Sequence, residues 1–218
     1  MQDLIKHEQF ELEVLGKLNS ARLLKELVFC GGTMLRLCHG LNRFSVDLDF
    51  WLIKEIDTKK LFLRLSDCLG EKYKVKDSCN KFNTLLFELS SKDYSRSLKI
   101  EIRKEVRKVK VEQSIAYGKN STLQVILKSV TLQEMMRAKF AALIDRREIR
   151  DAYDLEFLVK RGISIELGVK ERAGAIEIID NFKKVDYSSK LGALLEPAER
   201  KYYIAKNFTI LKEALKSL

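Results

Sequence analysis

The sequence predicts a mixed α/β fold followed by a helical C-terminal domain. Apolar residues recur at helical spacing from residue 4 to residue 27, and short stretches with strand character follow as far as residue 127. Nearly all of the chain after residue 131 has a helical pattern. We therefore expect an α/β domain over residues 1–130 and a helical domain over residues 131–218. The first domain is predicted to hold a mixed sheet of three to five strands with helices on one side.

Composition and charge limit the classes of protein to which the chain can belong. Hydrophobic residues make up 46% of the 218 residues and charged residues 33%, which allows a packed core. The 41 Lys and Arg against 31 Asp and Glu give a net charge of +10, which favours acidic partners such as nucleic acid or nucleotides. The four cysteines form no CxxC pair and lie in or beside apolar runs, so we expect reduced core residues and no zinc site. Because no apolar run has the length of a membrane span, we expect a cytoplasmic protein without a membrane partner.

Glycines mark the limits of the first elements. Val28-Phe29-Cys30 is typical of a short buried strand, and this strand stops at Gly31-Gly32. Thr33 is expected to cap a helix that Gly40 ends, because Thr favours the N-cap and Gly favours the residue after a helix. After a turn, residues 46–52 form the next strand candidate.

The rest of the first domain combines one helix with several strands. Asp57-Thr58 has the pattern of a helix start. Strand character then appears in four stretches: 73–76, 82–89, 98–103 and 123–127. Apolar and charged residues alternate throughout 98–103, which places Glu101 on the polar face of that strand.

The C-terminal part begins with a recognisable helix start. Thr131-Leu132-Gln133-Glu134 matches a capping box, in which the Thr and the Glu satisfy each other's backbone N–H groups. Helices are expected over 132–146, 149–160, 165–183 and 198–216. Pro197, the single proline, suits the first turn of the last helix.

Two aspartates give the sharpest chemical signal. Asp47 and Asp49 are two residues apart on a predicted strand, so both carboxylates project from the same face. Neighbouring like charges repel each other, and a half-buried pair is costly unless a cation neutralises it. Mg²⁺, with Mn²⁺ as the alternative ion, takes carboxylate oxygens and keeps places for water and phosphate oxygens. The pair therefore indicates metal-assisted phosphoryl or nucleotidyl transfer.

Gly31 and Gly32 complete this pattern. They end a strand and open a helix, so backbone N–H groups can face an anion without a side chain in the way. A triphosphate bound there would lie close to the metal carboxylates.

The sequence leaves two candidates for a third acid. Glu101 fits best, because it lies on the polar face of an otherwise apolar strand, and Glu88 is its rival. Either residue could instead be an ordinary cross-strand partner of a Lys or Arg.

Two segments resemble a known family. Val28-Phe29-Cys30-Gly31-Gly32-Thr33, followed by Arg43-Phe44-Ser45-Val46-Asp47-Leu48-Asp49-Phe50, resembles the signature of the AbiEii/AbiGii-type nucleotidyltransferase toxins. These belong to the DNA polymerase β-like nucleotidyltransferase superfamily. Downstream, Lys139, then Arg146 or Arg147, then Arg150-Asp151-Ala152-Tyr153-Asp154-Leu155 resembles the family's helical lysine and its Arg-Asp-x-Tyr-Asp-Leu motif. The resemblance implies a polymerase β-like nucleotidyltransferase core.

The resemblance also implies roles for individual residues. The residues expected to bind the triphosphate are Gly31, Gly32, Thr33, Arg43, Ser45 and Lys139. Asp47 and Asp49 would hold the metal, with Glu101 as a further ligand or as the base that activates the acceptor. Asp151 and Asp154 lie one turn apart on a helix, where they either position Lys139 or form ion pairs with Arg146, Arg147 or Arg150. Arg43 could likewise pair with a nearby acid.

The implied reaction is transfer of a nucleoside monophosphate from an NTP to an acceptor with release of pyrophosphate. The resemblance implies a toxin of a type IV toxin–antitoxin or abortive-infection system, with a cognate antitoxin. An RNA acceptor such as tRNA suits the stretch from Arg96 to Glu112, which holds seven Lys or Arg and three Glu. The alternatives are a small-molecule nucleotidyltransferase of the antibiotic-modifying kind and a degenerate transferase that binds nucleotide or RNA as a regulatory module.

Overall fold

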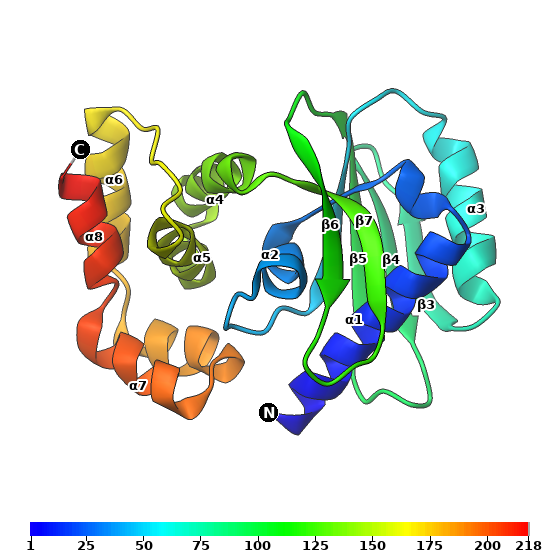
Figure 1. Cartoon of the computed structure of the whole chain (residues 1–218), viewed down its shortest axis with the longest axis horizontal. Helices are drawn as coiled ribbons and strands as arrows, with labels where there is room; N and C mark the ends of the chain where they lie inside the picture. Colours follow the sequence, from blue (N-terminus) through cyan, green and yellow to red (C-terminus); the bar gives the residue numbers. More distant parts are fainter. Residues whose placement is uncertain (218) are drawn as a thin grey trace. The chain divides into compact units, whose positions relative to one another are not determined.

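The computed structural model describes residues 1–217, and these residues form two compact units. The first unit comprises Met1–Gly40 and Phe44–Val130. The second comprises Leu41–Arg43 and the chain from Thr131 onward. Figure 1 shows the strands gathered in the first unit and helices making up the second. The predicted mixed α/β fold followed by helices is confirmed.

The first unit is built on a mixed sheet with the strand order β3-β4-β5-β2-β1-β7-β6. Its strands are β1 Val28–Cys30, β2 Asp47–Leu52, β3 Lys74–Asn80, β4 Thr84–Ser90, β5 Leu98–Val106, β6 Val111–Tyr117 and β7 Gln124–Val130. β1 runs antiparallel to β2 but parallel to β7, and β2 runs parallel to β5. The expected three to five strands are too few, and β6 is the strand that the sequence did not reveal. Its polar run Glu112-Gln113-Ser114 breaks the alternation, and it becomes a strand through its pairing with β7.

One face of the sheet forms the core of this unit. On the three strands β2, β4 and β5, the residues of this face are apolar and fully buried, or nearly so: Leu48, Phe50, Leu85, Phe87, Ile100 and Ile102. Helix α3, Thr58–Gly70, covers them, and its Phe62 ring stacks on Phe87 with centroids 5.0 Å apart. Because side chains alternate along a strand, the residues between these apolar positions project from the opposite face.

The first helices confirm some predicted limits and correct others. α1 spans Gln2–Ser20, so the helical spacing seen as far as residue 27 overestimates its length. The left-handed backbone of Arg22, with φ 59°, separates α1 from a short 3-10 turn over Leu23–Lys25. Asp57 caps α3 as predicted, since its carboxylate accepts from the N–H groups of Lys59 and Lys60 at 3.0 Å.

Helix α2, Gly31–His39, begins three residues earlier than expected. Its N-cap position is Cys30, and Thr33 lies inside the first turn, so the prediction of Thr33 as the cap is wrong. Gly40 ends the helix in the left-handed conformation as predicted, with φ 75°. Figure 1 shows α2 and α3 on opposite sides of the sheet. The expectation of helices on one side therefore fails, because the chain leaves β1 toward the face that α3 does not cover.

The second unit contains five helices of eight residues or more within its described residues. They are α4 Leu132–Arg146, α5 Ile149–Lys160, α6 Val169–Asp180, α7 Pro197–Lys206 and α8 Thr209–Lys216. α4 and α5 have the predicted limits, and the Thr131 hydroxyl accepts from the Glu134 N–H as the capping box requires. The single helix expected over 198–216 is instead two helices. The left-handed residues Asn207 and Phe208, with φ 47° and 51°, separate the two helices. The sequence pattern did not predict this break, because neither residue is a proline or a glycine. None of the helices within residues 1–217 has the length and apolar character that crossing a bilayer requires.

Candidate active site

Asp47 and Asp49 lie on β2, on the face of the sheet opposite the apolar core. Both are half-buried, whereas Leu48 and Phe50 beside them are buried. β2 pairs in parallel with β5 so that Asp47 lies beside Lys99 and Asp49 beside Glu101. Since neighbouring strands are about 4.8 Å apart and register partners share a face, Glu101 is next to Asp49 on this acidic face.

The register distinguishes the two candidates for a third acid. Glu88 on β4 pairs with Lys99, not with Glu101, so a full strand and a lysine separate it from Asp47. The distance across two strand spacings is about 9.6 Å. Glu88 also lies 4.0 Å from the Lys76 amine, as an ordinary cross-strand partner does. The register thus favours Glu101, and Glu101 also has a lysine nearby, since the Lys99 amine lies 3.6 Å from its carboxylate.

Gly31 is the residue that brings the start of α2 against Asp49. Its φ of +81° is a conformation that side chains disfavour. A Cβ added to Gly31 would lie 3.0 Å from the Asp49 Cβ and 3.1 Å from its Cγ, and closer still to its Oδ2. The backbone can therefore pass this carboxylate only without a side chain. Gly32 follows as a buried residue of the first helical turn, where the backbone N–H groups have no partner within the helix.

Two predicted phosphate ligands in this segment have different surroundings. The Thr33 side chain is fully buried, and its hydroxyl donates to the backbone oxygen of Asp47 at 2.6 Å. Its hydroxyl is thus held by β2, not directed at solvent. Ser45 lies two residues before Asp47 and is partly exposed.

The second unit carries a cluster of buried charges built around α4 and α5. The Lys139 amine donates to Asp151 Oδ1 at 3.1 Å and lies 2.6 Å from Asp154 Oδ2. Arg146 donates to both oxygens of Asp151 at 2.7 Å. Both sequence-based alternatives for these aspartates are therefore realised at once, because Asp151 holds Lys139 and Arg146 together.

Arg43 is the remaining member of this cluster. Its guanidinium makes two bonds of 2.6 Å to the Asp154 carboxylate, and both side chains are almost inaccessible to solvent. Burial acts to raise the pKa of Asp154, but Arg43 and then Lys139 outweigh it and lower that pKa. Burial acts to lower the pKa of Arg43, and Asp154 outweighs it in the opposite direction. The cluster thus sets three basic side chains against two carboxylates, an excess of one formal positive charge.

Sequence reasoning missed a group of buried polar residues on α1. His7, Glu8 and Glu11 are at most 5% exposed. They lie on the same side of the helix as Leu4, Leu15 and Leu18, which are also buried, following the i, i+3, i+4 spacing. The signal that could have revealed them is their helical spacing, which places these polar residues among the apolar residues of the buried side.

The acidic face fits a magnesium ion by the chemistry of its donors. Mg²⁺ is usually held by one or two carboxylates together with substrate phosphates, not by a closed protein cage. Within residues 1–217 no three His, Cys, Asp or Glu side chains converge as such a cage. Two half-buried carboxylates on one strand face match an ion that takes its other ligands from a nucleotide and from water.

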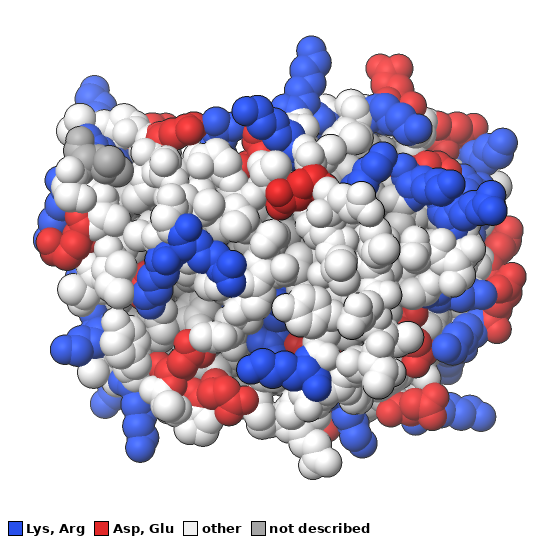
Figure 2. Space-filling view, in the orientation of Figure 1, with Lys and Arg blue, Asp and Glu red and all other residues white. Residues whose placement is uncertain are grey.

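The basic stretch from Arg96 to Glu112 does not form one continuous stripe. Lys99 and Arg103 alternate with Glu101 on the acidic face, whereas the Arg107 guanidinium lies 4.3 Å from the centre of the Trp51 ring. Figure 2 shows blue and red side chains interspersed over the visible face instead of one positive patch. Lys99 and Arg103 thus bring positive charge from β5 to the face that carries the carboxylates.

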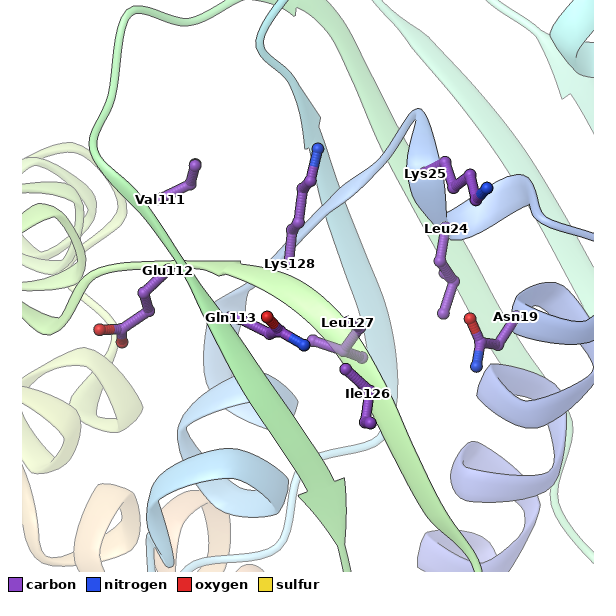
Figure 3. Close-up of a pocket in the computed structure, with 9 residues that line it drawn as sticks. All are labelled: Asn19, Leu24, Lys25, Val111, Glu112, Gln113, Ile126, Leu127 and Lys128. Atoms are coloured by element: carbon purple, nitrogen blue, oxygen red, sulfur yellow. The ribbon is translucent and has the colours of Figure 1, made fainter.

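A hollow on β6 and β7 is separate from these residues. It has a volume of about 480 Å³, and Figure 3 shows its lining, which includes Leu24, Val111, Ile126 and Lys128. None of the predicted site residues lines it.

The fold and the acidic strand define a nucleotidyltransferase, with Gly31-Gly32 opening a helix against the carboxylates of β2. Residues 13–178 match the family model described as nucleotidyl transferase AbiEii toxin, type IV toxin–antitoxin system. The chain belongs to this family, and the resemblance noted in the sequence is confirmed.

Solved structures share the fold along almost the whole chain. JHP933 from Helicobacter pylori is 20% identical, with a TM-score of 0.57, over 95% of this chain and 93% of that chain. MenT4, a nucleotidyltransferase toxin from Mycobacterium tuberculosis, is 17% identical, with a TM-score of 0.56, over 97% of this chain and 86% of that chain. None of the curated proteins matches the sequence.

Proposed function

We propose that this chain transfers a nucleoside monophosphate from an NTP to an RNA acceptor such as tRNA, in a reaction that depends on Mg²⁺. The observation that carries the proposal is the acidic face of β2, where Asp47 and Asp49 project together and Glu101 lies beside Asp49. As a toxin of a type IV system, the chain would have a cognate antitoxin that relieves its effect.

The proposed roles follow from the chemistry of each group. Asp47 and Asp49 would hold Mg²⁺, which when bound neutralises negative charge on the phosphates. An acceptor oxygen attacks the α-phosphorus, the bond to the β-phosphate oxygen breaks, and pyrophosphate leaves. Glu101 is the neighbouring carboxylate that can take the proton from the acceptor. N–H groups in the first turn of α2 suit an anion. Gly31 lets the start of this helix lie against the Asp49 carboxylate.

Further cations support binding of phosphate groups and of RNA. Lys139 and Arg43 belong to a cluster with one excess positive charge, which suits a polyanionic ligand. Lys99 and Arg103 lie on the same face of β5 as Glu101, where they can contact the backbone phosphates of an RNA. Such contacts predict labelling that weakens as salt rises.

The decisive experiment incubates the purified protein with each α-labelled NTP, Mg²⁺ and total RNA, with total protein and with aminoglycosides in parallel. We expect label in RNA, and mass spectrometry of the labelled RNA would identify the added nucleotide. Label in aminoglycosides alone would instead support a small-molecule nucleotidyltransferase. NTP binding without any transfer would support a regulatory module.

Matched variants connect the result to the acidic face. Asp49→Ala should lower transfer by at least about 100-fold, equivalent to about 2.7 kcal/mol of transition-state stabilisation, while the thermal unfolding temperature stays near that of the wild type. Glu101→Gln should also lower the rate strongly. Glu88→Gln is the control, because Glu88 lies a strand further away, and it should leave transfer unchanged. Full activity of the Asp49→Ala protein would refute the metal assignment.

A further inference from the structure

Two buried side chains hold the backbone at the very start of the acidic strand. His7 of α1 places Nε2 2.9 Å from the backbone oxygen of Val46. Thr33 of α2 donates its hydroxyl to the backbone oxygen of Asp47 at 2.6 Å. Because a carbonyl oxygen only accepts, the His7 bond requires the hydrogen to be on Nε2. His7 is 1% exposed and Thr33 is 0% exposed, so both donors are shielded from water, while Val46 and Asp47 are half-buried.

The need for these contacts comes from the short length of β1. β1 pairs with β2 only from Val28 opposite Trp51 to Cys30 opposite Asp49. At Gly31 the chain turns into α2, so the residues of β2 before Asp49 extend beyond the last residue of β1. Among the described strands, β2 pairs at Asp47 with β5 and no longer with β1. Side chains from two helices therefore supply donors to the backbone where β1 no longer pairs with β2.

We propose that His7 and Thr33 are positioning residues that fix the Val46 and Asp47 peptide groups and thereby aim the carboxylates of Asp47 and Asp49. The inference rests on the proposed metal-dependent transfer, since it assigns the carboxylates the role of metal ligands. Neither residue contacts substrate in this assignment. Each acts through the backbone from which the carboxylates project.

The physical reason is the sensitivity of metal-assisted transfer to small displacements. A buried carbonyl that loses its donor costs about 1–3 kcal/mol, and the backbone relieves this cost by rotating toward another partner. Rotation of the Asp47 peptide turns the Cα–Cβ bond and moves the carboxylate with it. A misplacement of about 1 Å in a catalytic group can lower a rate about 100-fold even when the fold is intact.

The test uses two variants at each position, one that removes the hydrogen-bond donor and one that retains it. Thr33→Val keeps the shape and removes the hydroxyl, whereas Thr33→Ser keeps the hydroxyl. His7→Leu removes the donor, whereas His7→Gln retains an N–H group in the place of Nε2. We expect the Val and Leu variants to lose 10-fold or more in transfer rate and to need a higher Mg²⁺ concentration for half the maximal rate. The Ser and Gln variants should recover most of both properties.

Direct metal binding separates this inference from the proposed function. Mn²⁺ binding in the presence of an NTP is followed by electron paramagnetic resonance for the wild type, Asp49→Asn and the four variants, with thermal unfolding as a check of the fold. Weakened Mn²⁺ binding in Thr33→Val and His7→Leu, restored in Thr33→Ser and His7→Gln, is the expected result.

If Asp49→Asn binds Mn²⁺ as tightly as the wild type, the proposed metal role fails. If Asp49→Asn loses Mn²⁺ but Thr33→Val and His7→Leu retain wild-type binding and rate, the positioning role alone is refuted. Equal losses in Thr33→Val and Thr33→Ser would likewise refute it, because the hydroxyl would then not matter.

Discussion

Gly31 can occupy its position beside Asp49 only because it has no side chain. The residue both adopts φ +81° and passes within contact distance of the Asp49 carboxylate. The turn therefore sets the spacing between the first N–H groups of α2 and the acidic face of β2. A phosphate that accepts from those N–H groups could share a metal ion with Asp49.

Replacing Gly31 should affect both stability and activity. Gly31→Ala introduces a left-handed non-glycine residue, at a cost of about 1–2 kcal/mol, and its Cβ also meets the Asp49 carboxylate. We expect a protein that unfolds at a lower temperature and transfers nucleotide at a strongly reduced rate. Gly16→Ala is the control, because Gly16 lies within α1 with open space around its Cα, and it should raise stability by up to about 1 kcal/mol. Normal transfer by Gly31→Ala would show that the close approach to Asp49 is not needed.

At the scale of one element, α1 does more than cover the sheet. Its side facing the protein interior includes Glu11, which is fully buried and whose Oε1 lies 3.7 Å from His7 Nε2. Burial, and then the nearby Glu8, raise the pKa of Glu11 well above its usual value. A group with a raised folded-state pKa binds its proton more tightly in the folded protein. Its contribution to stability is complete below the unfolded-state pKa and is lost as pH rises through the folded-state pKa.

Glu11→Gln should therefore make stability less sensitive to alkaline pH. Gln mimics the protonated carboxyl group and cannot ionise, so the variant should resemble the wild type at about pH 5 and exceed it in unfolding temperature at about pH 9. Glu13→Gln on the same helix is the opposite case. Burial acts to raise the pKa of Glu13, but bonds from Lys72, Tyr94 and Tyr73 outweigh it and lower that pKa, so this variant should lose stability at both pH values. A Glu11→Gln protein without an alkaline gain would contradict the assigned protonation state.

At the scale of the whole molecule, buried charge is concentrated differently in the two units. The first unit keeps Asp47 and Asp49 half-buried on a strand face. In the second unit, each charged residue of the buried cluster has an oppositely charged partner. Asp154 pairs with Arg43 and Lys139, and Asp151 pairs with Lys139 and Arg146. Removing one partner from such a cluster leaves a buried charge uncompensated, at a cost of about 3–5 kcal/mol. The lowered pKa of Asp154 means that its contribution is present above the unfolded-state pKa and is lost as pH falls through the folded-state value.

Asp154→Asn should accordingly lower the free energy of unfolding by about 3–5 kcal/mol at neutral pH. Urea denaturation of the full chain measures this loss. Asp180→Asn in the same unit is the matched control, because Asp180 pairs with Lys212 while more than half exposed, and such pairs contribute about 0–1 kcal/mol. Equal stability of the two variants would show that the buried cluster is not a stabilising one.

Local patterns determined the fold class, the acidic strand and much of the helical part. Asp57, Thr131 and Gly40 marked helix limits correctly, because their capping bonds join residues within one turn. Thr33 did not, because its hydroxyl bonds to Asp47. Asp47 and Asp49 could be placed on one face because strand periodicity is also local. The break at Asn207 and Phe208 escaped prediction, because a left-handed backbone at those residues depends on how α7 and α8 pack.

The sequence by itself determined that this chain carries a glycine turn followed by a pair of strand carboxylates, and with it the nucleotidyltransferase family. Only the tertiary structure decided which acid lies beside Asp49, because the β2–β5 register places Glu101 there and Glu88 a strand away. It also assigned Thr33 to the backbone of Asp47 and Arg43 to Asp154. These contacts join residues 14 and 111 positions apart in the chain, and no local pattern specifies such pairs because they arise only when distant elements pack together.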